Sequence, residues 1–168
     1  VLPAIAWLVS GKNPLQFLRA VSQPMVTALF TSSSAATLPL SMQTAQEKLG
    51  VDQARSAFVL PLGATANMDG TALFEGIAAV FLAYMFGIDL GTTGVIAIFL
   101  VAMLSSVGAP GIPSGSMAGM QMVLLAVGIP LEAIGLLLLI ERPLDTFRTA
   151  VNVEGDLVGC LVAKRFAS

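Results

Sequence analysis

Two apolar stretches of the chain are each interrupted by a short segment of small and turn-forming residues. Residues 14–46 are interrupted by TSSSAATLP (31–39), and residues 92–129 by GAPGIPSGS (108–116). Each apolar half has about 10–17 residues, whereas a helix that crosses a bilayer needs about 20. Irregular backbone survives at membrane depth only where protein or a water-filled cavity covers its amides. The sequence therefore predicts two re-entrant helical hairpins in a membrane protein.

The composition supports an all-α membrane protein and excludes several functions. Of the 168 residues, 56% are hydrophobic and 11% are charged, against roughly 25% charged in soluble domains. The net charge is −2 and there is no basic run, so a nucleic-acid partner is not expected. The chain has no histidine and one cysteine, which excludes histidine-based proton chemistry and the usual zinc sites.

The whole chain, residues 1–168, is interpreted as a C-terminal piece of a larger transporter. Its start does not resemble a signal peptide, because no basic segment precedes the first apolar stretch. We expect the end of a transmembrane helix (1–10), hairpin 1 (14–46), a broken transmembrane helix (56–87), hairpin 2 (92–129) and a last transmembrane helix (130–164). An N-terminal scaffold is expected to be absent from this sequence.

The basic residues predict the topology of these segments. Three cytoplasmic regions are marked by Lys12, Arg19, Lys48, Arg55, Lys164 and Arg165 under the positive-inside rule. The loops at 87–94 and 128–132 carry no basic residue and are expected outside. Hairpin 1 would then open inward and hairpin 2 outward, so that the two are inverted relative to each other. Such paired broken segments point to the binding site of a transporter.

The strongest polar signal lies in the last apolar helix. Five polar residues share one face of this helix, at offsets of 0, 3, 4, 7 and 11 from the first: Asp145, Arg148, Thr149, Asn152 and Asp156. Glu141 extends the same face by one turn towards the N-terminus. Arginine suits carboxylate recognition, and Asp145 offers a charge for an ammonium group. Asn152 and Asp156 offer oxygen ligands to a hard cation. A structural ion network, or a helix lying at the membrane surface, is the alternative interpretation.

A second polar segment, Asn67-Met68-Asp69-Gly70-Thr71, interrupts the apolar stretch 56–87. It predicts a helix break with free carbonyls and a buried charge that needs a cation, although the pattern does not separate Na⁺ from a proton. The alternative is a plain glycine kink with a protonated Asp69. Glu75, one turn further along, fits either an ion-paired structural carboxylate or a proton carrier. The tips at 32–39 and 105–116 offer backbone amides to an anion, although each alone fits an ordinary turn equally well.

Four motifs together resemble those of the dicarboxylate/amino acid:cation symporter family. This family includes bacterial and archaeal glutamate/aspartate transporters and the excitatory amino acid transporters. The motifs are TSSSAATLP (31–39), LPLGATANMDGTALFE (60–75), SSVGAPGIPSGS (105–116) and LDTFRTAVNVEGD (144–156), in the family's order. The resemblance covers nearly the whole chain and implies an elevator-type transport core.

The resemblance also implies the residues that bind the substrate. These are Ser33, Ser34, Thr71, Gly115, Asp145, Arg148, Thr149 and Asn152. In such transporters Asp145 would take the amino group, Arg148 the side-chain carboxylate, and Asn152 with hairpin 1 the α-carboxylate.

Three cation sites follow from the same resemblance. The first site would use the carbonyls of Gly63, Asn67 and Asn152 with the Asp156 carboxylate. The second would use the backbone of Thr65, Ser106, Val107 and Ala109. The third would use the Asn67–Met68–Asp69 segment together with a helix outside this sequence. Asp156 resembles the sodium-coupled branch, and Glu75 the glutamate of members that also carry a proton. Sodium is thus the expected bound ion, without an organic cofactor.

The chain departs from the family pattern at two positions. Family members usually carry an additional arginine near the substrate, where this chain has Ser32 and Thr146. We therefore hypothesise that Arg142 replaces it as the partner of Asp145.

The predicted function is sodium-coupled symport of L-glutamate or L-aspartate by an elevator mechanism, and not enzymatic catalysis. A full-length form is expected to be a homotrimer in the plasma or bacterial inner membrane, in contact with lipid. A C4-dicarboxylate symporter is the nearest alternative, although succinate has no ammonium to match Asp145. A non-transporting membrane fragment and an intramembrane aspartyl hydrolase that uses Asp69 and Asp156 are the others.

Overall fold

The computed structural model describes residues 1–166, and every regular element in that range is a helix. The elements are α1 (Leu2–Ser10), α2 (Pro14–Thr31), α3 (Ser34–Glu47), α4 (Gln53–Ala66), α5 (Asp69–Met85), α6 (Gly91–Ser106), α7 (Met117–Ala126), the 3₁₀ turn η1 (Leu131–Ala133) and α8 (Ile134–Phe166). The predicted all-α class is therefore confirmed.

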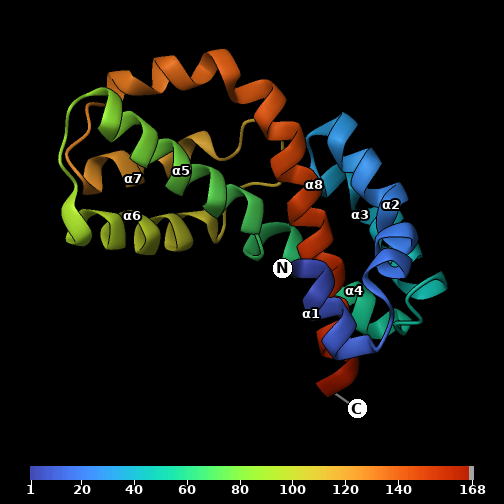
Figure 1. Cartoon of the computed structure of the whole chain (residues 1–168). Helices are drawn as coiled ribbons and strands as arrows, with labels where there is room; N and C mark the ends of the chain where they lie inside the picture. Colours follow the sequence, from blue (N-terminus) through green and yellow to red (C-terminus); the bar gives the residue numbers. More distant parts are fainter. Residues whose placement is uncertain (167–168) are drawn as a thin grey trace.

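Helix α8 runs through the molecule and connects its two parts (Figure 1). Its N-terminal half lies beside α5 and α7, and its C-terminal half packs against α1 to α4. The helix bends between the two halves, in the stretch that contains Pro143 (Figure 1). A proline inside a helix removes one N–H donor and its ring crowds the preceding turn, which accounts for the bend.

Each part has its own apolar core. The core around the C-terminal half of α8 includes Phe17, Val21, Leu60, Leu157 and Leu161. The core around its N-terminal half includes Leu82, Ile98, Met120, Leu124 and Leu137. Because α8 contributes to both cores, one helix fixes the position of the polar face that lies between them.

The distribution of polar and apolar side chains is the reverse of that in a soluble protein. Phe30, Tyr84 and Leu139 are 82%, 88% and 82% exposed, whereas Glu75 and Asp145 are 0% and 2% exposed. A surface this apolar suits contact with lipid, and charges in a membrane face the protein interior. The fold therefore agrees with a membrane location.

Two pairs of helices meet at their tips. Helices α2 and α3 pack against each other and are joined by Ser32, at φ 49°, and Ser33, whose side chain caps α3 by accepting from the Ala36 amide at 3.1 Å. Helices α6 and α7 form the second pair, joined by residues 107–116. The tips touch, because the Ala35 amide donates to the Gly111 carbonyl at 3.2 Å. Their re-entrance into a membrane stays a prediction.

The apolar stretch 56–87 is divided into α4 and α5. Asn67 and Met68, between the two helices, have φ and ψ of −109° and 78° and of −109° and 56°. Gln53–Met85 as a whole is the one segment among the described residues that is long and apolar enough to cross a membrane, while α6 and α7 are apolar but shorter. The break thus leaves backbone groups without helical partners in the middle of this segment.

The first turn of α5 is held very close to α8. A Cβ atom on Gly70 would lie 2.3 Å from the carbonyl oxygen of Arg148, closer than the two atoms can approach. Gly76, later on the same helix, has open space around its α-carbon. The close contact at Gly70 is therefore specific to the point where the helix break meets α8.

We expect Gly70→Ala to lower the apparent melting temperature in detergent by about 3–10 °C. Overpacking costs about 1–3 kcal/mol, and each kcal/mol shifts the midpoint by about 2–4 °C in a chain of this size. The matched variant Gly76→Ala should not lower the melting temperature and should raise it by about 2–4 °C, since helix propensity favours alanine by about 1 kcal/mol. Equal melting temperatures for the two variants would contradict this packing.

Candidate functional site between the hairpin tips and the last helix

Asn152 of α8 caps the first turn of α5. Its side-chain oxygen accepts from the amides of Gly70 at 2.7 Å and Thr71 at 3.4 Å. Its amide nitrogen donates to the Thr71 hydroxyl at 3.2 Å and contacts the Met68 sulfur at 3.2 Å. Asn152 is 3% exposed, so bulk water hardly reaches this point. The Asn152 oxygen satisfies two backbone donors that the helix break leaves free. The structure thus joins two predicted substrate residues, Thr71 and Asn152.

The residues of the first predicted cation site gather between the helix break and α8. The Asn67 amide donates to an oxygen of Asp156 at 3.0 Å. A Cβ on Gly63 would lie 2.5 Å from that same oxygen, and a Cβ on Gly155 would lie 2.8 Å from an oxygen of Asp69. Only glycine therefore allows α4 and α8 to approach these carboxylates so closely. Carboxylate and carbonyl oxygens are the ligands that hard cations prefer.

The second predicted cation set lies where the tip of the α6–α7 pair meets α4. The Gly108 amide donates to the Thr65 carbonyl at 2.7 Å, and the Ala109 amide donates to the Ser106 carbonyl at 3.2 Å. These bonds bring Thr65 to the segment that contains Ser106, Val107 and Ala109. Within residues 1–166 no three Asp, Glu or Cys side chains cluster as metal ligands. A cation site at this place stays a prediction.

Arg148 is the centre of a buried group of charges on α8. Its guanidinium binds Asp145 through Nε at 3.1 Å and Nη2 at 2.5 Å, and binds Glu141 through Nη2 at 3.1 Å. The guanidinium carbon lies 4.6 Å from the centre of the Phe74 ring, a cation–π contact. The three charged residues are between 2% and 5% exposed, and the group carries a formal charge of −1.

The tip of the α6–α7 pair closes over this charged group. The Ser114 amide donates to Asp145 at 2.9 Å, and the Ser114 hydroxyl donates to Glu141 at 3.1 Å. Ser114 has a φ of 61°, a left-handed conformation that is uncommon for a residue with a side chain. On the other side, the Ser33 hydroxyl donates to the Gly111 carbonyl at 2.7 Å. The carboxylates of Asp145 and Glu141 therefore both hold the tip.

A small cavity of about 10 Å³ remains beneath the two tips, room for about one water molecule. It is lined by seven of the eight predicted substrate residues, Ser34, Thr71, Gly115, Asp145, Arg148, Thr149 and Asn152, together with Ser32, Met68, Pro110, Gly111, Ile112 and Ser116. Three polar atoms of these residues are buried without a hydrogen-bond partner within the described chain: Ser34 Oγ, Ser116 Oγ and Arg148 Nη1. All three can donate a hydrogen bond, so the lining of the cavity suits an acceptor such as a carboxylate.

Glu75 lies apart from this cavity, enclosed by α5, α6 and α7. It is fully buried, its Oε2 accepts from the Ser105 hydroxyl at 2.5 Å, and its Oε1 has no partner within the described residues. A Cβ on Gly119 would lie 2.3 Å from Oε1, so the Glu75 carboxylate packs directly against α7 at this point and a larger residue there would displace it. The role of Glu75 as a proton carrier stays a prediction.

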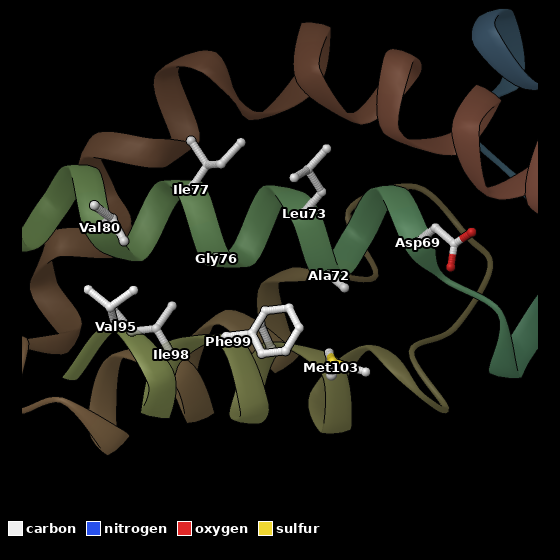
Figure 2. A pocket seen from close by; sticks show the side chains of 11 residues that line it. Asp69, Ala72, Leu73, Gly76, Ile77, Val80, Val95, Ile98, Phe99 and Met103 are labelled. Atoms are coloured by element: carbon white, nitrogen blue, oxygen red, sulfur yellow. The ribbon is translucent and has the colours of Figure 1, made fainter. Parts of the chain in front are cut away.

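An apolar groove of about 530 Å³ runs between α5 and α6 (Figure 2). Asp69 lies at one end of it, beside the helix break, and the other lining residues, such as Leu73, Ile77 and Phe99, are apolar (Figure 2). A groove with a single polar group does not suit an amino acid, which needs several polar contacts. The smaller polar cavity is therefore the better candidate for the substrate site.

Several site residues were not predicted from the sequence. Glu141 extends the polar face of α8, and Ser114 lies in a predicted tip, but nothing in the sequence indicated that the two would meet. Phe74 gave no signal, because an aromatic residue in an apolar helix is usually a packing residue. The hypothesis that Arg142 partners Asp145 is wrong: Arg148 forms the ion pair with Asp145, and Arg142 is exposed.

Comparison with known proteins gives a consistent result. The sequence matches the sodium:dicarboxylate symporter family over residues 1–166. It is 44% identical to excitatory amino acid transporter 3 of Mus musculus over 167 residues, 99% of this chain and 32% of the relative. It is 48% identical to excitatory amino acid transporter 2 of Homo sapiens over 158 residues, 94% of this chain and 28% of the relative. An excitatory amino acid transporter of Caenorhabditis elegans is 43% identical over 166 residues, 99% of this chain and 33% of the relative.

The chain thus spans about a third of the length of the curated relatives it matches. These relatives are transporters and not enzymes, which removes the aspartyl hydrolase alternative.

The bond between Ser114 and Asp145 makes a prediction for the dynamics of the tip. We expect Asp145→Asn to speed amide hydrogen exchange in residues 107–116 about tenfold, because a hydrogen bond to a charged group contributes about 1.5–3 kcal/mol. Asp89→Asn is the matched control, since Asp89 accepts from the Gly91 amide at 3.1 Å at the start of α6, away from the tip. Unchanged exchange of residues 107–116 in Asp145→Asn would show that the carboxylate does not hold the tip.

Proposed function

Because the chain belongs to the sodium:dicarboxylate symporter family, we propose that it binds an acidic amino acid together with sodium ions and carries them across a cell membrane. The relatives named as excitatory amino acid transporters support L-glutamate or L-aspartate as the substrate. This chain matches about a third of the length of such a transporter. We expect transport to require other regions of the protein as well.

One observation supports this proposal most directly: three buried donors without partners line a single cavity beside a carboxylate. Ser34 Oγ, Ser116 Oγ and Arg148 Nη1 await acceptors, and each unmade bond costs about 1–3 kcal/mol. Asp145, 2% exposed on the same cavity, supplies the opposite charge. An acidic amino acid has two carboxylates and one ammonium group, and so offers partners to all of these groups.

We assign the substrate groups to the residues according to charge. The side-chain carboxylate would bind Arg148, the ammonium group Asp145, and the α-carboxylate the Asn152 amide together with the serines of hairpin 1. Thr71, Thr149 and Gly115 complete the walls. Since Asp145 already pairs with Arg148 at 2.5 Å, binding would exchange that ion pair for two new ones with the substrate.

The tip of hairpin 2 must move before a substrate enters. A cavity of about 10 Å³ is far smaller than the roughly 300–1,000 Å³ of small-molecule sites. The hydrogen bonds from Ser114 to Asp145 and Glu141 would break as the tip withdraws. The bound substrate would then accept hydrogen bonds from Ser114 or take its place beside the two carboxylates. Residues 107–116 are thus proposed as the gate of the site.

Sodium ions would bind next to the substrate as co-transported cations. The Asp156 carboxylate and the carbonyls around Asn67 would hold one ion, and Thr65 with the segment from Ser106 to Ala109 a second. Each ion would order the same helix break and the same tip that the substrate needs. Substrate and sodium would therefore strengthen each other's binding by thermodynamic linkage.

We further propose the arrangement of the complete transporter. The helices described here would form the moving part of a multi-pass membrane protein, with hairpins α2–α3 and α6–α7 entering the membrane from opposite sides. The core would move as one body past a separate scaffold, in a homotrimer, in a plasma or bacterial inner membrane.

A C4-dicarboxylate is the second candidate substrate. The unpartnered donors Ser34 Oγ, Ser116 Oγ and Arg148 Nη1 support it, because they suit the carboxylates of either substrate. Competition by succinate against L-aspartate separates the two candidates, since equal competition would favour the dicarboxylate. A fragment without transport activity would bind neither.

Sodium dependence provides the first test of this function. We expect calorimetry on the protein, expressed from its complete coding sequence, to show L-aspartate binding in NaCl and at least tenfold weaker binding in choline chloride. Asp156→Asn should weaken the sodium dependence, because it removes the one charged ligand of the first cation site. Equal binding in both salts would exclude coupling to sodium.

Removal of an unpartnered donor tests the substrate site itself. We expect Ser34→Ala and Ser116→Ala each to weaken L-aspartate binding by about tenfold, because each loses a hydrogen bond to a charged group. Neither hydroxyl has a partner in the empty site, so the melting temperature without substrate should not fall. Ser41→Ala, a buried serine of α3 that does not line the cavity, is the control. Unchanged affinity in both site variants would rule out this cavity.

A further inference from the structure

Basic residues from distant parts of the chain surround a cavity at the end of the molecule that is expected to face the cytoplasm. The cavity has a volume of about 320 Å³ and lies between the ends of α1 and α8 and the loop after α3. Its charged side chains are Lys12, Lys164 and Arg165, and its apolar walls include Val9, Leu49 and Leu161. We refer to this cavity as the basic pocket.

The two lysines of the basic pocket are fixed by one loop. The Lys12 ammonium donates to the Lys48 carbonyl at 2.8 Å, and the Lys164 ammonium donates to the Leu49 carbonyl at 3.1 Å. Gly50, at φ 68°, lets the loop come close, since a Cβ there would lie 3.1 Å from the Lys164 nitrogen. The lysines therefore stabilise the C-terminal end of α3, and each ammonium group has three donors, which leaves some available.

The basic pocket contains positive side chains that are not paired with acidic side chains of the described residues. No acidic residue is among those that line it. Arg55, on the same predicted side, pairs with Asp52 at 2.6 Å, and the Arg55 backbone N–H, by donating to that carboxylate, lowers the pKa of Asp52. The side chain of Arg165 is exposed and has no hydrogen bond or ion pair within the described part of the chain. Among residues 1–166, three positive charges thus line one pocket with no acidic side chain beside them.

The position of the pocket indicates the kind of anion. By the positive-inside rule its basic residues are expected at the cytoplasmic face, and its remaining walls include the apolar side chains of Val9, Leu49 and Leu161. Basic pockets at this level of a membrane protein bind phosphate groups of lipids, and each basic side chain near the surface contributes about 1 kcal/mol. We propose that the basic pocket binds the phosphate headgroup of an anionic phospholipid from the cytoplasmic leaflet.

This proposal rests on the membrane orientation and not on the identity of the transported substrate. Its test needs no transport, so that its failure and a failure of the proposed function are distinguishable. Arg165 is the most informative position, because it takes no part in the cap of α3 that the two lysines form.

Lipid binding in detergent provides the experiment. The protein, expressed from its complete coding sequence, is titrated with phosphatidylglycerol and with phosphatidylcholine of the same acyl chains, and bound lipid is counted by native mass spectrometry. We expect phosphatidylglycerol to bind at least tenfold more tightly. Arg165→Gln should weaken it about fivefold, as expected for one basic side chain, and Lys164→Gln about as much. Arg19→Gln, which removes an exposed charge outside the pocket, should have less than a twofold effect.

Three results would overturn the proposal. Equal affinity for the two lipids would show that the headgroup charge is not recognised. Equal weakening by Arg165→Gln and Arg19→Gln would assign the effect to general surface charge. A titration with soluble glycerol phosphate is the third arm: if it displaces phosphatidylglycerol at equal concentration, the pocket recognises a free phosphate and not a lipid. The melting temperature of Lys164→Gln without lipid separates loss of binding from loss of the α3 cap.

Discussion

The ion pair between Arg148 and Asp145 is the interaction on which the rest of the site depends. A guanidinium and two carboxylates lie between 2% and 5% exposed on one helix, in a protein whose outer surface is apolar. Unpaired, each charge would be strongly destabilising. Paired, they form a polar centre to which Ser114 of the α6–α7 tip donates two hydrogen bonds. Ser33 of the α2–α3 tip in turn donates to the Gly111 carbonyl of the α6–α7 tip. The fold therefore encloses its charges instead of exposing them.

The broken helix places a second polar centre beside the first. The free amides at the start of α5 are satisfied by Asn152, and Asn67 reaches Asp156 one turn further along α8. Asn152 thus belongs both to the cavity and to the neighbourhood of the proposed cation ligands. A substrate that moved Asn152 would also move those ligands, and this is the physical route that we propose for coupling. The glycines at 63, 70 and 155 make these approaches possible.

The parts of the account that depend on local sequence were predictable. Helix content, the break at Asn67 and Met68, the two tips and the polar face of α8 follow from residue type and spacing, and the motifs indicated the family. Contacts between distant segments were not. The sequence does not show that Ser114 reaches Asp145 and Glu141, that Phe74 lies under Arg148, or that Lys12 and Lys164 meet one loop. The partner of Asp145 was mispredicted because Arg142 and Arg148 both lie three residues from it, and the family resemblance assigns Arg148 to the substrate carboxylate.

The central claim is that this site couples an acidic amino acid to sodium. The most direct measurement is uptake of radiolabelled L-aspartate into proteoliposomes that contain the protein expressed from its complete coding sequence. The account predicts accumulation above the external concentration when sodium is higher outside, and loss of accumulation when sodium is equal on both sides. Uptake that is the same with and without the sodium gradient would contradict it.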